Sequence, residues 1–133
     1  WPMYQQHDRP FPYPEKVIDS ILSLQNEDGS WRAVGNYLDL DALYGLAYMR
    51  SLAPDHRPED ILKAVRKHGD LTIKNYKRFM AGKPDTHAVL AMVGILGLLQ
   101  QFEPDRFTDT VTWTDIFSDI RLYNTKDVEY TKN

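Results

Sequence analysis

Two stretches of the sequence match each other at a separation of 44 residues. Residues 14–21 (PEKVIDSI) and 58–65 (PEDILKAV) both begin with proline and glutamate, and apolar residues coincide at their fourth, fifth and eighth places. The same separation aligns Asp41 with Asp85 and Leu46 with Leu90. A repeat of this length is typical of arrays of helical hairpins. We therefore predict an all-α chain built from two copies of a helix pair.

The first helix of each pair is predicted to begin at its proline. Pro14 and Pro58 stand where a missing N–H costs nothing, and the glutamate that follows suits the positive end of the helix dipole. Apolar residues of 17–24 fall mostly at three- and four-residue spacings, which indicates one buried and one solvated side. The second copy, over 60–78, carries a basic cluster that we interpret as a solvated outer face, and Gly69 is a candidate break within it.

The second helix of each pair, over 41–52 and 86–100, is apolar on almost every side. Because a helix without a polar face has to be buried on most sides, we expect these two to be inner helices and the first two to be outer helices. Glycines such as Gly94 favour close approach between the packed helices. The longest apolar run, 88–99, has twelve residues, fewer than the roughly 18 that indicate a membrane span. No membrane partner is expected.

These elements define one helical domain over residues 1–133, with hairpins at 14–53 and 58–101. A further helix is predicted at about 114–123, and residues 107–113 are interpreted as a loop. The chain opens at Trp1 with neither an initiator methionine nor a leader, so we expect it to be a portion of a longer protein.

Composition narrows the classes of function. The absence of cysteine excludes disulfides, thiolate metal sites and a cysteine nucleophile. A net charge of −3 gives no electrostatic reason to expect nucleic acid. His7, His56 and His68 lack the spacing of metal ligands, and no phosphate-binding loop or dinucleotide fingerprint is present, so neither a metal nor a cofactor is expected. The partners that remain are an oligosaccharide or small-molecule substrate, and the rest of the parent chain or another subunit.

Residues 25–31, QNEDGSW, follow the first predicted helix. The Asp-Gly-Ser sequence around Gly29 is typical of a turn that ends a helix. The stretch resembles the QW motif, Gln-x-x-x-Gly-x-Trp, of the terpenoid cyclases and related α/α toroids, which include protein prenyltransferases and several polysaccharide lyases. The resemblance implies a partial α/α toroid in which Gln25 ties its helix to a neighbouring helix while the Trp31 ring stacks over that amide.

Candidate functional residues gather at the predicted starts of the inner helices. The resemblance implies that a toroid cavity is reached from this end. Carboxylates and an imidazole that meet there are suited to general acid–base catalysis, and aromatic faces are suited to packing against a sugar or an isoprenoid. The catalytic candidates are Asp39, Asp41, Asp85 and His87, and the substrate-binding candidates are Trp31, Tyr37 and Tyr44.

A second interpretation of the same residues stays open. Aspartate before an apolar run is a common helix N-cap, and Asp41 and Asp85 fit that role. His87 equally fits a histidine that makes a hydrogen bond at a helix start. The sequence Asp-Leu-Asp-Ala over 39–42 resembles the Asp-x-Asp-Asp motif of class II terpene cyclases, with Asp41 at the position of the proton donor and Ala42 in place of the last aspartate.

Three hypotheses for the function follow. The leading one is a carbohydrate-active α/α-toroid enzyme, a glycoside hydrolase or polysaccharide lyase, of which this chain is a portion. The second is a non-catalytic helical-repeat scaffold that presents an apolar surface to a partner. The third is a terpenoid cyclase-like or prenyl-binding toroid.

Overall fold

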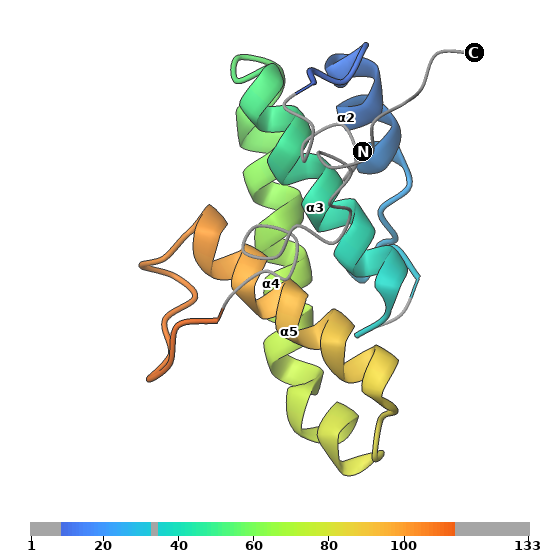
Figure 1. Cartoon of the computed structure of the whole chain (residues 1–133), viewed down its shortest axis with the longest axis vertical. Coiled ribbons are helices and arrows are strands. Elements are labelled where there is room, and N and C mark those ends of the chain that lie inside the picture. The colour runs from blue at the N-terminus through green and yellow to red at the C-terminus, as the bar shows by residue number, and fades with distance from the viewer. Residues whose placement is uncertain (1–8, 33–34, 114–133) are drawn as a thin grey trace, which may run out of the picture.

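The computed structural model describes residues 9–32 and 35–113, and within these ranges it contains helices and loops but no strand. The helices are α2 (Pro14–Ser23), α3 (Tyr37–Leu52), α4 (Pro58–Ala81) and α5 (Thr86–Phe102). Figure 1 shows them as two antiparallel hairpins, α2 with α3 and α4 with α5. The prediction of an all-α fold is confirmed for the described part of the chain.

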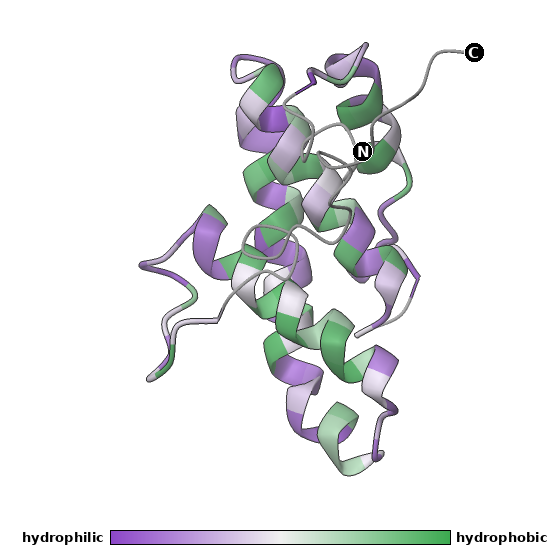
Figure 2. Cartoon of the chain, viewed as in Figure 1, coloured by the Kyte–Doolittle hydropathy of each residue, from purple (hydrophilic) through white to green (hydrophobic). Residues whose placement is uncertain are grey.

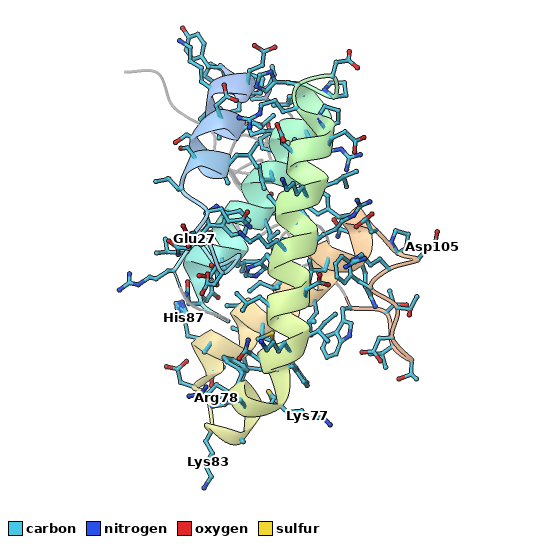
Figure 3. All side chains as sticks on the ribbon, turned by 180° about the vertical axis from the view of Figure 1, so that it is seen from behind. Glu27, Lys77, Arg78, Lys83, His87 and Asp105 are labelled. Carbon is cyan, nitrogen blue, oxygen red and sulfur yellow. The ribbon has the colours of Figure 1, made fainter. Side chains whose placement is uncertain are left out.

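Helix α3 lies in the middle of the arrangement and packs against both α2 and α5. Figure 1 shows α3 and α5 in front of α4, and the reverse view in Figure 3 shows α4 in front. The helices therefore form layers, with α3 and α5 side by side in one and α4 in the other, while α2 contacts both α3 and α4.

The outer helices α2 and α4 begin where their prolines predict. Pro14 and Pro58 are the first residues of these helices, and each follows a residue in the left-handed region, Tyr13 with φ of 59° and Arg57 with φ of 51°. The basic cluster of α4 is a solvated face, as expected, because its members are all exposed: Lys63, Arg66, Lys67, Lys74, Lys77 and Arg78.

Helix α4 continues without interruption through Gly69, so the expected break there is wrong. The glycine is buried, and a Cβ at this position would overlap the ring of Phe107, which lies on the loop after α5. Gly69 thus serves close packing between α4 and that loop. Its cost in helix propensity, about 1 kcal/mol relative to alanine, is offset by burial of the Phe107 ring, which is 6% exposed.

The inner helices α3 and α5 supply most of the core. Nine of 16 residues are buried in α3 and seven of 17 in α5, compared with two of ten in α2, so the prediction of inner and outer helices is confirmed. A Cβ at Gly94 of α5 would lie 2.8 Å from Cδ1 of Leu40 in α3, which shows the close approach that this glycine predicted. Figure 2 shows how predominantly apolar α5 is along its length.

The first inner helix starts four residues earlier than predicted, at Tyr37. Its N-cap is Asn36, whose side chain accepts hydrogen bonds from the backbone N–H groups of Leu38 and Asp39. In the second inner helix the N-cap is Asp85. The separation of 44 residues therefore relates the starts of the outer helices but not those of the inner ones, because α4 is 24 residues long and α2 only ten.

Residues 103–113 form neither helix nor strand, which confirms the interpretation of 107–113 as a loop. The helix predicted at about 114–123 lies outside the described residues. None of the described helices is both long and apolar enough to cross a membrane.

Candidate functional site

The motif at residues 25–31 lies against α4. The Gln25 side chain donates from Nε2 to two carbonyl oxygens, that of Gly29 at 3.0 Å and that of Ala64 in α4 at 2.9 Å. The indole N–H of Trp31 donates to the carbonyl oxygen of Ile21 at 2.8 Å, near the end of α2. Gln25 thus makes the tie to a neighbouring helix that the QW resemblance implied. Trp31 joins the motif to α2, the helix that precedes it.

Gly29 is required in this turn for two reasons. Its φ of 99° lies in the region that favours glycine, and a Cβ there would approach the carbonyl oxygen of Lys67 in α4 to 2.8 Å. The turn itself is closed by Asp28, whose Oδ1 accepts from the backbone N–H and the hydroxyl of Ser30 at 2.9 and 2.7 Å. The backbone of the motif therefore sits directly on α4.

Asp39 has a structural role beside this motif. It is fully buried, and its Oδ1 accepts from the backbone N–H groups of Trp31 at 2.7 Å and Arg32 at 3.2 Å, so it joins the start of α3 to the motif. No described residue donates to its Oδ2, which is also buried. Burial raises the pKa of Asp39, and the nearby His68 works against that rise.

His68 is the other buried ionisable residue beside this motif. Its Nδ1 lies 3.1 Å from the carbonyl oxygen of Gly29, and because a carbonyl can only accept, Nδ1 carries the proton. In the neutral ring Nε2 then accepts from the Thr72 hydroxyl at 3.3 Å. Burial lowers the pKa of His68, an effect opposed by the charge of Asp39. The ring lies 5.4 Å from that of Trp31 between centroids.

The starts of the two inner helices meet at one end of the fold. The rings of Tyr37 at the start of α3 and His87 at the start of α5 pack edge to face with centroids 3.8 Å apart. Figure 3 shows His87 at this end, where α3 and α5 both begin. Asp41 follows Tyr37 by four residues and so lies on the same face of α3. We name Tyr37, Asp41 and His87 the rim.

The residues of the rim differ in exposure. His87 is exposed, whereas Tyr37 and Asp41 are half-buried. Burial raises the pKa of the Asp41 carboxyl above its usual range. Because Asn36 caps α3, Asp41 lies more than one turn inside the helix, and the interpretation of Asp41 as an N-cap is wrong. The position of Asp41 therefore needs a different explanation from helix capping.

Two other candidates have structural roles. Asp85 is exposed and its Oδ1 accepts from the backbone N–H of Ala88 at 2.8 Å, so its interpretation as an N-cap is confirmed. Tyr44, expected to offer an aromatic face to a substrate, is 3% exposed and packs in the core. Of the seven catalytic and substrate-binding candidates, Tyr37 contacts His87, and Asp41 lies on the same helix as Tyr37. Asp39 is buried beside the motif, and Trp31 is half-buried within it.

Sequence reasoning missed the role of His68, although a signal for it was present. His68 follows Ile61, Ala64 and Val65 at seven, four and three residues, so it continues the apolar stripe of α4. A histidine on such a stripe is expected to be buried and hydrogen-bonded. Across residues 9–32 and 35–113, no three histidine or acidic side chains lie close enough together to hold a metal ion.

Comparisons of the chain with known protein families, with curated proteins and with solved structures found no match. Function therefore has to be inferred from the geometry of the described residues.

Proposed function

We propose that this chain is a two-hairpin portion of a carbohydrate-active α/α toroid, a glycoside hydrolase or polysaccharide lyase, and that its rim contributes to the sugar-binding cavity. The contact between Tyr37 and His87 carries the proposal, because it brings together the starts of both inner helices. By the QW resemblance, a toroid cavity would be reached from this end. The layering of α3 and α5 against α4, and the tie from Gln25 to α4, support the same architecture.

Asp41 is the proposed acid of the rim. It stands four residues after Tyr37 on α3, and its raised pKa keeps the proton to a higher pH than an exposed carboxyl would. A general acid with these properties suits protonation of a glycosidic oxygen. His87 adds an exposed imidazole with hydrogen-bonding capacity toward sugar hydroxyls, and Tyr37 adds a phenol.

The test compares two conservative substitutions in the protein that carries this chain. Asp41→Asn removes the proposed proton, and we expect turnover of an oligosaccharide substrate to fall by at least about 100-fold. Asp85→Asn is the matched control, since asparagine caps a helix as well as aspartate does, and it should retain turnover. Release of reducing ends reports hydrolysis, and formation of an unsaturated uronate reports elimination. Unchanged turnover in Asp41→Asn would show that the Asp41 carboxyl takes no part in the reaction.

The second candidate function is the non-catalytic helical-repeat scaffold, and exposed leucines of the inner helices favour it. Two leucines of the inner helices, Leu38 in α3 and Leu90 in α5, are 47% and 42% exposed. Apolar side chains in such positions are suited to contact with a further hairpin or with a partner chain. Light scattering separates the candidates, because the scaffold predicts association that increases with concentration and that Leu90→Ser weakens. A monomer at all concentrations would count against the scaffold.

A further inference from the structure

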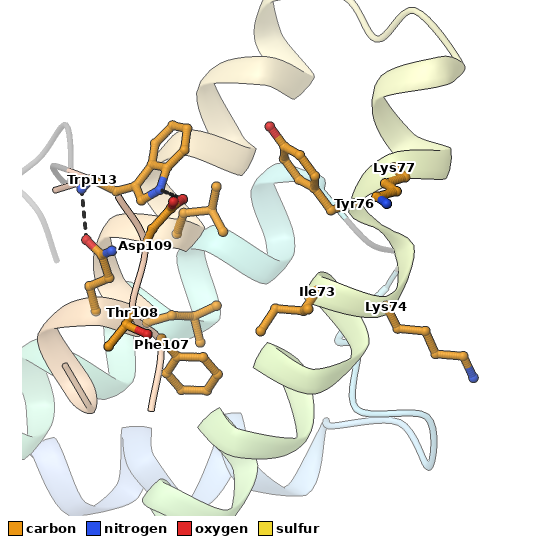
Figure 4. A pocket seen from close by; sticks show the side chains of 11 residues that line it. Ile73, Lys74, Tyr76, Lys77, Phe107, Thr108, Asp109 and Trp113 are labelled. Carbon is orange, nitrogen blue, oxygen red and sulfur yellow. Dashed lines mark hydrogen bonds between the residues drawn. The ribbon is translucent and has the colours of Figure 1, made fainter. Parts of the chain in front are cut away.

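A pocket of about 570 Å³ lies between the second half of α4, the second half of α5 and the loop at 107–113. Figure 4 shows Ile73 and Tyr76 of α4 on one side of it and Phe107 and Trp113 of the loop on the other. Its lining on α5 starts at Leu96, which lies nine residues from His87, or about 14 Å along the helix axis. The pocket is therefore separate from the rim.

The loop that forms one wall of the pocket is held in place by hydrogen bonds. Gln100 of α5 accepts from the backbone N–H of Trp113 at 2.8 Å and donates to the carbonyl oxygen of Val111 at 3.3 Å. The Trp113 indole N–H donates to Oδ2 of Asp109 at 2.9 Å. Because these hydrogen bonds fix the loop, binding to this wall loses little conformational entropy.

The walls of the pocket are largely apolar and aromatic. The volume falls within the range of about 300–1,000 Å³ that holds small organic ligands. Ile73 is 58% exposed, although it is a large aliphatic residue, and covering it would remove apolar surface from water. The apolar and aromatic lining residues are Ile73, Tyr76, Leu96, Leu99, Phe107 and Trp113.

The charges at the pocket favour an anion. Lys74 and Lys77 belong to the lining and are exposed, and neither forms an ion pair with a described residue. The one carboxyl of the lining, Asp109, already accepts from the Trp113 indole and from the backbone N–H of Thr110. Figure 4 shows the Lys74 side chain running from α4 away from Phe107 and Trp113 to its ammonium group, so this positive charge lies outside the apolar interior.

We propose that this pocket binds an amphipathic monoanion in solution, with an aliphatic or aromatic body against the apolar walls and its acidic group at Lys74 and Lys77. A medium-chain carboxylate such as decanoate has this chemistry. The apolar contacts supply most of the affinity, and the lysines select the sign of the charge.

The experiment titrates the full chain with three probes of equal chain length, decanoate, decanol and decylammonium, by calorimetry. We expect decanoate to bind more tightly than decanol and decylammonium most weakly. Methyl NMR on the same samples locates the ligand, with shifts expected at Ile73, Leu96 and Leu99. Equal affinity for decanoate and decylammonium would overturn the choice of an anion, and shifts confined to residues outside the pocket would overturn the location.

Two variants on exposed positions test the walls without disturbing the core. The double variant Lys74→Glu, Lys77→Glu should weaken decanoate about fivefold to tenfold and leave decanol unchanged, as expected for exposed ion pairs. Lys63→Glu, on an exposed position of α4 outside the pocket lining, is the matched control and should bind decanoate as the unmodified chain does. Ile73→Ser, which removes apolar surface without adding charge, should weaken all three probes.

Failure of all three probes to bind would overturn the proposal. A chain that ends at Trp113 then identifies the reason. If this shortened chain binds decanoate and the full chain does not, residues 114–133 occupy the pocket, and the pocket is an internal docking site in place of a ligand site.

Discussion

His68 of α4 donates a hydrogen bond from Nδ1 to the carbonyl oxygen of Gly29, although the two residues belong to different hairpins. The same carbonyl accepts from Gln25 Nε2, so one backbone oxygen joins the turn to α4 through two side chains. Asp39 then connects this turn to the start of α3. Two ionisable groups are thus buried in the contact between the hairpins, and the stability of that contact should depend on pH.

The first prediction concerns acidification. The pKa of His68 is lowered by burial from 6.5, so the unfolded state binds its proton more tightly and stability is lost as the pH falls below about 6.5. The pKa of Asp39 is raised from 3.8, so its contribution has the opposite sign, and stability is lost as the pH rises above 3.8 through the folded value. The free energy of unfolding, measured at about pH 7.5 and at about pH 5.5, gives the net effect of the two residues on stability.

Variants separate these two contributions. His68→Gln should make the fall in stability on acidification smaller than in the unmodified chain, whereas Asp39→Asn should make it larger. Gln101→Ala, at an exposed residue of α5 that carries no titratable group, is the control and should leave the fall unchanged. An unmodified chain and a His68→Gln variant with the same dependence on pH would show that His68 does not titrate in this range.

The second prediction concerns Gln25. Gln25→Ala removes hydrogen bonds to Gly29 and Ala64, and at roughly 1 kcal/mol for each bond we expect a loss of about 1–3 kcal/mol in the free energy of unfolding. Urea denaturation measures it. The control is Gln101→Ala on the exposed side of α5, where no hydrogen bond of the side chain to a described residue is lost. Equal stability of the two variants would mean that the tie does not stabilise the contact between the hairpins.

The outer helices could be predicted from local sequence because their start signals are local. Proline at the first helical position and glutamate after it require nothing from the rest of the chain. The start of α3 could not be fixed in this way, since Asn36, Asp39 and Asp41 all resemble caps. Contacts outside the helix decide which residue is the cap. The Asp39 side chain accepts a hydrogen bond from the backbone N–H of Trp31, eight residues away.

The uninterrupted α4 and the pocket depend on contacts between residues far apart in sequence. Gly69 looks like a helix break until Phe107 packs against it. Of the candidate site, the sequence predicted that the starts of the inner helices meet, which the contact of Tyr37 with His87 shows. It did not predict which carboxylates are buried, because burial of Asp39 depends on the turn and on α4 together.

The third prediction tests the packing at Gly69. Gly69→Ala gains about 1 kcal/mol in helix propensity, but its methyl group would overlap Cε1 and Cζ of the Phe107 ring. Overpacking of this kind costs about 1–3 kcal/mol, so we expect a net loss of stability. In a Phe107→Leu background these two ring atoms are absent and the remaining close neighbour is Leu99 Cδ2 at 3.1 Å, so Gly69→Ala should cost less there than in the unmodified chain. A thermal unfolding series of the four proteins measures the coupling, and identical effects in both backgrounds would contradict the contact.

The last prediction concerns Asp85 and uses measurements of stability to test its role as a helix N-cap. Its Oδ1 accepts from the backbone N–H of Ala88, and both aspartate and asparagine supply that oxygen. Asp85→Ala should therefore cost about 1 kcal/mol of unfolding free energy and Asp85→Asn only a small part of that. Because the charge of aspartate also favours the positive end of α5, the small remaining cost of Asp85→Asn should decrease at high salt. An asparagine variant as unstable as the alanine variant would show that the charge, and not the hydrogen bond, holds the start of α5 beside Tyr37.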